Sequence, residues 1–311
     1  MTRVRAYAPG TVANLGPGFD VLGLALEGAG DTVLAEHSET PGVTIRSAGH
    51  PEIPTDPARN TAGIAASAVL RRAGASPGGV VLEVRKGLPL SGGQGGSAAS
   101  AAAAAVATNA LYGSPLSRAD LLEPCLEAEE SVAGRHADNV AAALFGGLIL
   151  VASLDPLDIV ELSWPRSLRV VLAEPEQTSE TGESRARLPA SVGREVAVAQ
   201  AASLAALVSA LAAADFDRVR RALQDRIAEP VRSARLAGFR EAKAAALEAG
   251  AYGCSISGSG PAAFALAVGE DMAVRIGSAM VEAYARAGVR ARFRSAVADR
   301  KGAYVLPGEE A

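Results

Sequence analysis

The sequence predicts an α+β fold made of two packed halves, and three observations support this prediction. The chain has 311 residues, more than a single hydrophobic core usually holds. Its opening part alternates apolar and polar residues in short segments, which is typical of strands. Its second half combines strands with long Ala- and Leu-rich segments at helical spacing, and helices laid on an antiparallel sheet form an α+β unit. The turn-like residues 163–166 place the boundary so that the halves are residues 1–164 and 165–311.

The first half is expected to begin as a sheet and to continue through a β-α-β unit into helices. Alternation and turn residues predict strands at Val4–Ala8, Val21–Leu26, Thr32–Glu36, Val43–Ser47, Val80–Arg85 and Leu148–Ser153. Apolar residues at helical spacing predict helices at Asn60–Ala73, Ala98–Leu111, Leu116–Ala133 and Ala137–Leu144. Ser117 and Asp120 would lie in the first turn of the third helix, where side-chain oxygens cap free amides.

The second half is expected to lay helices on an antiparallel sheet. Its predicted strands are Leu168–Ala173, a strand–loop–strand at Cys254–Leu266, Ala291–Ser295 and Ala303–Val305. Its predicted helices are Ser191–Ala214, Asp217–Ala228, Ala237–Ala249 and Met272–Ala287.

Composition narrows the classes of function. The net charge is −4, and no block of Lys and Arg stands apart from acidic residues, so nucleic acid is not an expected partner. The two cysteines, Cys125 and Cys254, lack metal-ligand spacing and are expected to be reduced thiols in the core. The longest apolar stretches, residues 98–107 and 141–152, are shorter than the roughly 20 residues of a membrane span, and no signal-peptide pattern opens the chain. We therefore expect a cytoplasmic enzyme without a membrane partner.

A glycine-rich loop at Gly92–Ser97 leads from a predicted strand into the Ala-rich helix. Helix N-termini carry unpaired N–H groups and partial positive charge, so this order is typical of a phosphate-binding loop. A Walker loop is excluded because no Lys follows the glycines, and Lys86 is the only lysine nearby. A dinucleotide-binding loop stays open, since Gly93-x-Gly95-x-x-Ala98 fits its pattern, although a predicted helix occupies the stretch where a strand ending in an acid is expected. A plain turn that packs the helix is the third alternative.

The same loop resembles the ATP loop of the GHMP kinases, whose usual form is Pro-x-x-x-Gly-Leu-Gly-Ser-Ser-Ala-Ala. Gln94 and Gly96 stand where Leu and Ser are commoner. A second glycine loop, within Cys254–Phe264, resembles the third GHMP motif, which closes over the ATP phosphates. The resemblance implies an ATP site made of Pro89, Leu90, Ser91, Gly92, Gly93, Gln94, Gly95, Gly96, Ser97, Ala98, Ala99, Ser257, Gly258, Ser259 and Gly260. It also implies a ribosomal protein S5 domain 2-like N-terminal half and a ferredoxin-like C-terminal half.

The segment Ala8–Gly23 is similar to the first motif of homoserine kinases, one branch of that family. Stretches similar to this branch recur at Glu129–Leu144, Thr181–Pro189 and Glu229–Arg232. The resemblance implies ATP-dependent phosphorylation of the side-chain hydroxyl of homoserine, a step of threonine biosynthesis. The implied substrate contacts are Asn14, Asp20, His136, Thr181, Arg185 and Arg232. Arginines suit an amino-acid substrate, since a guanidinium group binds a carboxylate in a bidentate manner.

The resemblance also implies Mg²⁺ on the ATP phosphates. Ser97 and Glu129 would hold it, with Glu130 as the alternative to Glu129, because Mg²⁺ on ATP usually takes one or two protein oxygens. The implied catalytic residues are Asp138, Asn139 and His136. Asp138 is the candidate base, but transfer without a dedicated base stays open, in which case Asp138 orients its neighbours.

Two other readings of the same residues stay open. The chain could be another small-molecule GHMP kinase, or a GHMP-like protein that binds ATP without transferring phosphate. Asn14 and Asp20 could simply cap a turn, and Arg185 and Arg232 could be solvated surface charges. The oligomeric state is also open, with a homodimer among the alternatives.

Overall fold

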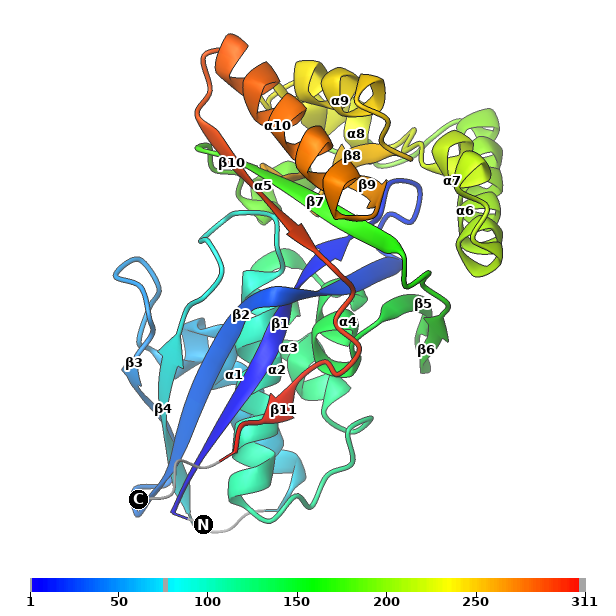
Figure 1. Cartoon of the computed structure of the whole chain (residues 1–311). Coiled ribbons are helices and arrows are strands. Elements are labelled where there is room, and N and C mark those ends of the chain that lie inside the picture. Colours follow the sequence, from blue (N-terminus) through cyan, green and yellow to red (C-terminus); the bar gives the residue numbers. More distant parts are fainter. Residues whose placement is uncertain (1, 75–77, 308–311) are drawn as a thin grey trace.

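The structure is a computed structural model that describes residues 2–74 and 78–307 (Figure 1). In this part of the chain a seven-stranded sheet forms the centre of the first half, with strand order β11-β1-β2-β4-β3 and with β5 and β6 joined through β2. The strands are β1 (Arg3–Ala13), β2 (Leu22–Ser38), β3 (Gly42–Ser47), β4 (Gly79–Arg85), β5 (Leu148–Leu154), β6 (Leu157–Leu162) and β11 (Tyr304–Val305). Only the pairing of β3 with β4 is parallel among these described strands.

Helices from the middle of the first half cover this sheet. They are α1 (Thr61–Arg72), α2 (Gly96–Leu111), α3 (Leu122–Ala133) and α4 (Asp138–Phe145), preceded by a short 3-10 helix, η1 (Pro57–Arg59). The Ala-rich helix α2 packs on β1 and β2 and is buried along most of its length. Small side chains let α2 lie close to the sheet, which fixes the position of its first turn, where the glycine loop ends.

The second half is a four-stranded antiparallel sheet with strand order β10-β7-β9-β8. Its elements are β7 (Leu168–Pro175), α5 (Thr181–Ala186), α6 (Arg194–Ala213), α7 (Phe216–Ala222), α8 (Ala228–Ser233), α9 (Phe239–Glu248), β8 (Cys254–Ile256), β9 (Ala263–Val268), α10 (Glu270–Arg286) and β10 (Ala291–Ala296). Phe239 and Tyr284 pack α9 and α10 against one face of this sheet. Its other face packs Val170 and Leu172 against Leu22 and Leu24 of β2. The two halves therefore share a hydrophobic core.

The chain crosses between the halves twice. Residues 163–167 lead from β6 into β7, and residues 297–303 lead from β10 back to β11 (Figure 1). The returning strand pairs with β1, with Ala6 opposite Val305 and Tyr7 opposite Tyr304. The last strand of the chain thus belongs to the first sheet, and the division after residue 164 stays a prediction.

Several predicted elements differ from the structure. The strands predicted at 21–26 and 32–36 form one strand, β2, which continues through Gly28 and Gly30. The helix predicted from Leu116 begins at Leu122, because Ser117 and Asp120 hydrogen-bond each other instead of capping it. The helix predicted at 217–228 ends at Ala222, because Asp225 accepts hydrogen bonds from the backbone of the next helix, α8. The short elements β6, α5 and α8 were not predicted.

One helix in the described ranges, α6, is long and apolar enough by length and composition to cross a membrane. The prediction of a helix at Ser191–Ala214 did not treat it as a membrane span, and core helices of soluble proteins can have the same length and composition. Leu207 and Leu211 of α6 are buried in the shared core, and Gln200 donates a hydrogen bond to the Pro17 carbonyl at 3.0 Å. The opposite face is open, and Val198 on it is 63% exposed.

Candidate functional site

The glycine loop joins β4 to α2, and its conformation requires glycine. Gly95 precedes the first residue of α2 and has a φ of 67°, in the left-handed region. A Cβ added to Gly95 would lie 2.0 Å from Thr11 Oγ1 and 2.9 Å from Asn139 Oδ1. Both the backbone conformation and the close approach of two side chains therefore exclude other residues at this position.

The carbonyl groups of this loop are held by protein donors. Gly93 O accepts from Ser257 Oγ at 2.6 Å, and Gln94 O accepts from the Thr11 amide at 3.0 Å. Gly96 O accepts from Lys86 Nζ at 2.8 Å. The first turn of α2 has no side-chain cap, so its N–H groups are available to an anion. Satisfied carbonyls and free amides make the loop suited to phosphate.

The loop lines a cavity of about 440 Å³. Asn60, Lys86, Glu129, Asn139, Thr181, Gly258 and Ser259 also line it. Lys86 is not a free phosphate ligand, because its Nζ pairs with the buried Asp31 and donates to Ser100 Oγ at 2.9 Å. Lys86 therefore stabilises the glycine loop through its hydrogen bond to Gly96 O.

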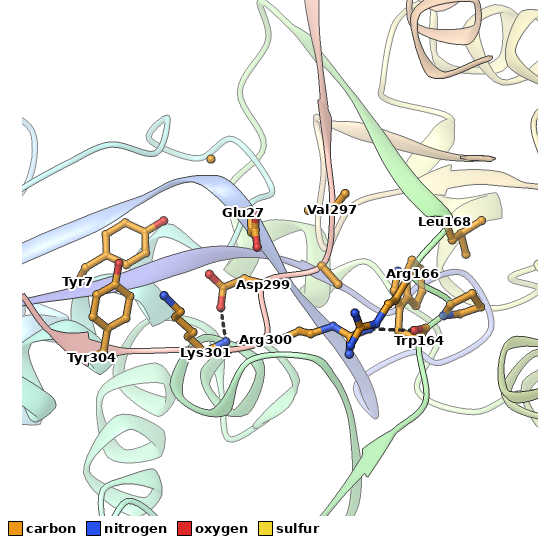
Figure 2. A pocket seen from close by; sticks show the side chains of 13 residues that line it. Tyr7, Glu27, Trp164, Arg166, Leu168, Val297, Asp299, Arg300, Lys301 and Tyr304 are labelled. Atoms are coloured by element: carbon orange, nitrogen blue, oxygen red, sulfur yellow. Dashed lines mark hydrogen bonds between the residues drawn. The ribbon is translucent and has the colours of Figure 1, made fainter. Parts of the chain in front are cut away.

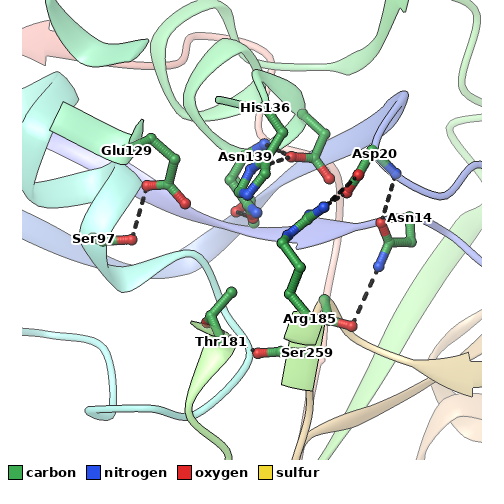
Figure 3. A network of polar contacts seen from close by, with 12 residues as sticks. Asn14, Asp20, Ser97, Glu129, His136, Asn139, Thr181, Arg185 and Ser259 are labelled. Carbon is green, nitrogen blue, oxygen red and sulfur yellow. Dashed lines mark hydrogen bonds and ion pairs between the residues drawn. The ribbon is translucent and has the colours of Figure 1, made fainter. Parts of the chain in front are cut away.

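Ser97 and Glu129 lie side by side at this cavity, with Ser97 Oγ 3.0 Å from Glu129 Oε2 (Figure 3). Glu129 is 3% exposed, and burial raises the pKa of its carboxyl group, although His136 and the Ser97 hydroxyl act in the opposite direction. No lysine or arginine in the described residues forms an ion pair with Glu129. Glu130, by contrast, is half-exposed and pairs with Arg135 at 3.5 Å.

These two oxygens fit Mg²⁺. A buried carboxylate that forms no ion pair with a described lysine or arginine is stabilised by a cation, and Mg²⁺ on a nucleotide needs only one or two protein ligands besides phosphate and water. The described residues contain no group of three or more His, Cys, Asp or Glu that could form an all-protein metal site. The geometry thus suits a metal that arrives with the nucleotide.

A second polar cluster joins both halves of the chain beside the cavity. Arg185 pairs with Asp20 through two hydrogen bonds of 2.8 and 2.6 Å (Figure 3). The Phe19 ring lies 5.5 Å from the Arg185 guanidinium and 5.3 Å from that of Arg232. Phe19 thus makes a cation–π contact with each of the two guanidinium groups.

Arg232 differs from Arg185 in having no carboxylate partner in the described part of the chain. It is 7% exposed, its Nη1 donates to Gly258 O at 2.7 Å, and its buried Nε has no hydrogen-bond partner among the described residues. Burial lowers the pKa of this guanidinium, and the charge of Arg185 lowers it further. An arginine nevertheless stays charged, so Arg232 is a buried cation suited to an anionic ligand.

Asn14 and Thr181 connect the motifs. The Asn14 side chain accepts from the Asp20 amide at 3.0 Å and donates to Gly258 O at 3.2 Å. Thr181 Oγ1 lies 3.2 Å from Ser259 Oγ. The first motif and α5 are therefore both tied to the second glycine loop, as Figure 3 shows.

The group at the start of α4 contains the candidate base. Asp138 is 2% exposed, and burial raises the pKa of its carboxyl group to about 6, with Asp20 adding to the rise. His136 acts in the opposite direction, its Nδ1 lying 3.7 Å from Asp138 Oδ1. Asn139 Oδ1 accepts from Thr11 Oγ1 at 2.7 Å. Asp138 is therefore largely ionised at neutral pH yet basic enough to accept a proton.

The structure brings the predicted residues together from separate segments of both halves of the sequence (Figure 3). It also adds three that the sequence analysis did not assign a role: Thr11, Phe19 and Lys86. Lys86 could have been identified from the sequence, because it is one of only three lysines and lies beside the glycine loop. Thr11 and Phe19 lie inside the first motif but have no chemistry that would single them out.

A cavity of about 570 Å³ lies elsewhere, where the two crossings between the halves meet (Figure 2). Trp164 and Arg166 of the first crossing line it together with Arg300 and Lys301 of the second. None of the predicted catalytic, metal or substrate residues lies there, so the chemistry is assigned to the smaller cavity.

Comparison with known proteins gives consistent matches. The family model described as GHMP kinases N terminal domain matches residues 60–147, and the model described as GHMP kinases C terminal matches residues 207–286. A homoserine kinase of Arabidopsis thaliana is 42% identical over 299 residues, covering 92% of this chain and 79% of the relative. A homoserine kinase of Chlorobium phaeobacteroides (strain DSM 266) is 40% identical over 296 residues, covering 91% and 92%.

Solved structures agree with these matches. The crystal structure of homoserine kinase from Cytophaga hutchinsonii superposes with a TM-score of 0.93 at 38% identity and covers 98% of each chain. A mevalonate kinase from L. major, solved in complex with R-mevalonate, has a TM-score of 0.68 at 18% identity and shares the fold alone.

Proposed function

The chain belongs to the homoserine kinases of the GHMP kinase family, and from this premise we propose how its site carries out the reaction. It is an enzyme that uses ATP to phosphorylate the side-chain hydroxyl of L-homoserine, giving O-phospho-L-homoserine in threonine biosynthesis. The predicted α+β fold with the two-domain GHMP kinase architecture is confirmed. The dinucleotide-binding interpretation is wrong, because α3 follows α2 where that fold requires a strand.

The observation that carries our proposal for the substrate is the buried, unpaired charge of Arg232 beside the Asp20–Arg185 pair. Homoserine carries a carboxylate and an ammonium group, so it needs partners of both signs. We assign its carboxylate to Arg232 and Arg185 and its ammonium group to Asp20. The substrate would share Asp20 with Arg185, and each charged group of the substrate would then meet a group of opposite sign.

The nucleotide end of the proposal rests on the glycine loop. The free N–H groups at the start of α2 would bind ATP phosphate oxygens, and the second glycine loop would cover them. Ser97 and Glu129 would hold Mg²⁺, which when bound neutralises phosphate charge. The protein's main contribution is to position the homoserine hydroxyl in line with the γ-phosphate, since a loose transition state needs mainly orientation and charge stabilisation.

For the proton of the hydroxyl we propose Asp138 as the acceptor. Its raised pKa is closer to neutrality than that of an ordinary carboxyl group, which favours general-base assistance. Asn139 and His136 flank it, with Asn139 held by Thr11 and His136 buried. A cytoplasmic location and the absence of nucleic-acid and membrane partners remain predictions from the sequence, and a homodimer remains one alternative for the oligomeric state.

An assay of ADP release tests the substrate assignment. With ATP and Mg²⁺, the enzyme is offered homoserine, mevalonate, galactose and shikimate in parallel. Homoserine should be turned over best, because mevalonate has a carboxylate without an ammonium group and galactose has neither. Mass spectrometry of the product should show phosphate on homoserine. Faster turnover of mevalonate would overturn the assignment of Arg232 and Asp20.

A further inference from the structure

Gln94 lies in the middle of the ATP loop, but its side chain is bonded to the other half of the molecule. The residue is only 2% exposed. Its Nε2 donates to Glu174 Oε1 on β7 at 2.8 Å, and its Oε1 accepts from Arg294 Nη2 on β10 at 2.9 Å. Both hydrogen-bonding groups of the amide are therefore used between the halves.

The partners of Gln94 form a firm support. Glu174 and Arg292 are directly paired in the β7–β10 ladder, and Arg292 Nε donates to Glu174 Oε2 at 2.7 Å. Arg294 Nε lies 3.4 Å from Glu174 Oε1. Arg294, whose side chain is 24% exposed, contacts both Glu174 and Gln94, whereas the 77% exposed Arg292 contacts Glu174 and does not contact Gln94.

The backbone of the same residue is bonded to the first half. Gln94 O accepts from the Thr11 amide of β1 at 3.0 Å, whereas the preceding Gly93 O accepts from Ser257 Oγ of the second glycine loop, which belongs to the second half. Residue 94 is therefore the point at which the ATP loop is fixed to both sheets at once. Movement of one sheet relative to the other would displace the loop through this residue.

We propose that Gln94 is a positioning residue for ATP, which keeps the phosphate-binding amides of the loop in their binding conformation by anchoring the loop to Glu174 and Arg294. This inference rests on the proposed use of the loop for ATP. Ligand affinity falls in proportion to the fraction of molecules in the competent conformation. Loss of the anchor should thus weaken ATP binding while leaving the homoserine contacts, which lie on other segments, unchanged.

The first test compares Gln94→Met with the matched control Arg292→Gln. Met keeps the length of the side chain and removes both hydrogen bonds, whereas Arg292→Gln removes a contact of Glu174 that does not involve the loop. We expect Gln94→Met to raise the KM for ATP about fivefold or more, with the KM for homoserine within about twofold of the wild type. Arg292→Gln should leave both values within about twofold.

The second test is an exchange that restores the hydrogen bond with reversed polarity. Gln94→Glu alone places two carboxylates face to face and should raise the KM for ATP. Adding Glu174→Gln lets the amide donate in the opposite direction, while Arg294 keeps an acceptor at position 94. The double variant should recover the KM for ATP to within about threefold of the wild type, which a general loss of stability would not produce.

The outcomes decide between this proposal and a purely structural role. An unchanged KM for ATP in Gln94→Met, an equal rise in Arg292→Gln, or no recovery in the exchange variant would each overturn it. If Gln94→Met does not fold, the exchange variant decides alone. Wild-type turnover of homoserine in the same assay tests the proposed function separately, so failure of the anchor and failure of the function are distinguishable.

Discussion

Replacing Arg232 by methionine gives the sharpest test of the substrate site. Met keeps the unbranched apolar stem and removes the guanidinium group. In the structure that group donates one hydrogen bond of 2.7 Å to Gly258 O and lies over Phe19. The described residues accept no other hydrogen bond from this guanidinium group, so the variant mainly removes N–H donors that are available to a ligand.

The expected effect on the substrate follows from the charge. A hydrogen bond to a charged group contributes about 1.5–3 kcal/mol, and about 1.4 kcal/mol corresponds to a tenfold change in affinity. The KM for homoserine should therefore rise at least about tenfold, and about a hundredfold if both guanidinium nitrogens bind the carboxylate. The KM for ATP should rise less than the KM for homoserine, because Arg232 does not itself line the cavity of the glycine loop and reaches it only through Gly258.

The expected effect on stability has the opposite sign. Loss of the bond to Gly258 O costs about 1.5–3 kcal/mol, but removal of an unpaired buried cation relieves a desolvation penalty of several kcal/mol. We expect the free energy of unfolding to equal or exceed that of the wild type. The matched variant Arg185→Met should instead be destabilised by about 1 kcal/mol, because it leaves Asp20 without its partner at a partly exposed site.

Two measurements check this reasoning. Steady-state kinetics with homoserine and ATP varied in turn gives the two KM values, and urea unfolding gives stability. A folded Arg232→Met enzyme with a normal KM for homoserine would refute the carboxylate assignment. Destabilisation by more than about 3 kcal/mol would instead identify Arg232 as a structural residue.

Further predictions concern the metal and the base. Ser97→Ala and Glu129→Gln should each lower turnover and raise the Mg²⁺ concentration needed for half-maximal activity, whereas the control Glu130→Gln should change neither. Titration of activity with Mg²⁺ measures this effect, and equal effects at both glutamates would contradict the assignment of Glu129. Asp138→Asn should lower kcat and abolish the rise of kcat with pH near 6, while the KM for homoserine should change little. A variant with near-wild-type turnover across the pH profile would exclude Asp138 as the base. Because the pKa of Asp138 rises from 3.8 to about 6 on folding, the native state binds the proton more tightly, so stability falls as the pH rises from about 4 to about 6. Asp138→Asn should therefore raise the free energy of unfolding at pH 7 and flatten its dependence on pH between about 4 and 6, as measured by denaturant unfolding.

Features encoded in contiguous residues could be predicted from the sequence. The glycine loop between β4 and α2 was predicted because its signals are adjacent: a strand, residues able to adopt positive φ, and a small-residue helix. The start of α1 was nearly right, since Asn60 caps it by accepting from the amides of Ala62 and Gly63. Buried thiols at Cys125 and Cys254 were also predicted and are confirmed.

Features that depend on distant contacts could not be predicted. Phe19 lies against Arg185 and Arg232, which are far away in the sequence, and no local pattern encodes that contact. The bonds of Gln94 to β7 and β10 likewise exist only once both halves are folded. The short helices α5 and α8 were missed because each has too few residues to show a helical period.

The pairing of β11 with β1 has a consequence for biosynthesis. Tyr304 and Val305 leave the ribosome after every other strand of the first sheet, so the outer edge of β1 stays unpaired while the second half is translated. An unpaired edge can pair with other chains, which exposes the nascent protein to aggregation during this interval. The helices of the first half can form and pack early, but the sheet of the first half is completed only after the whole second half has been synthesised.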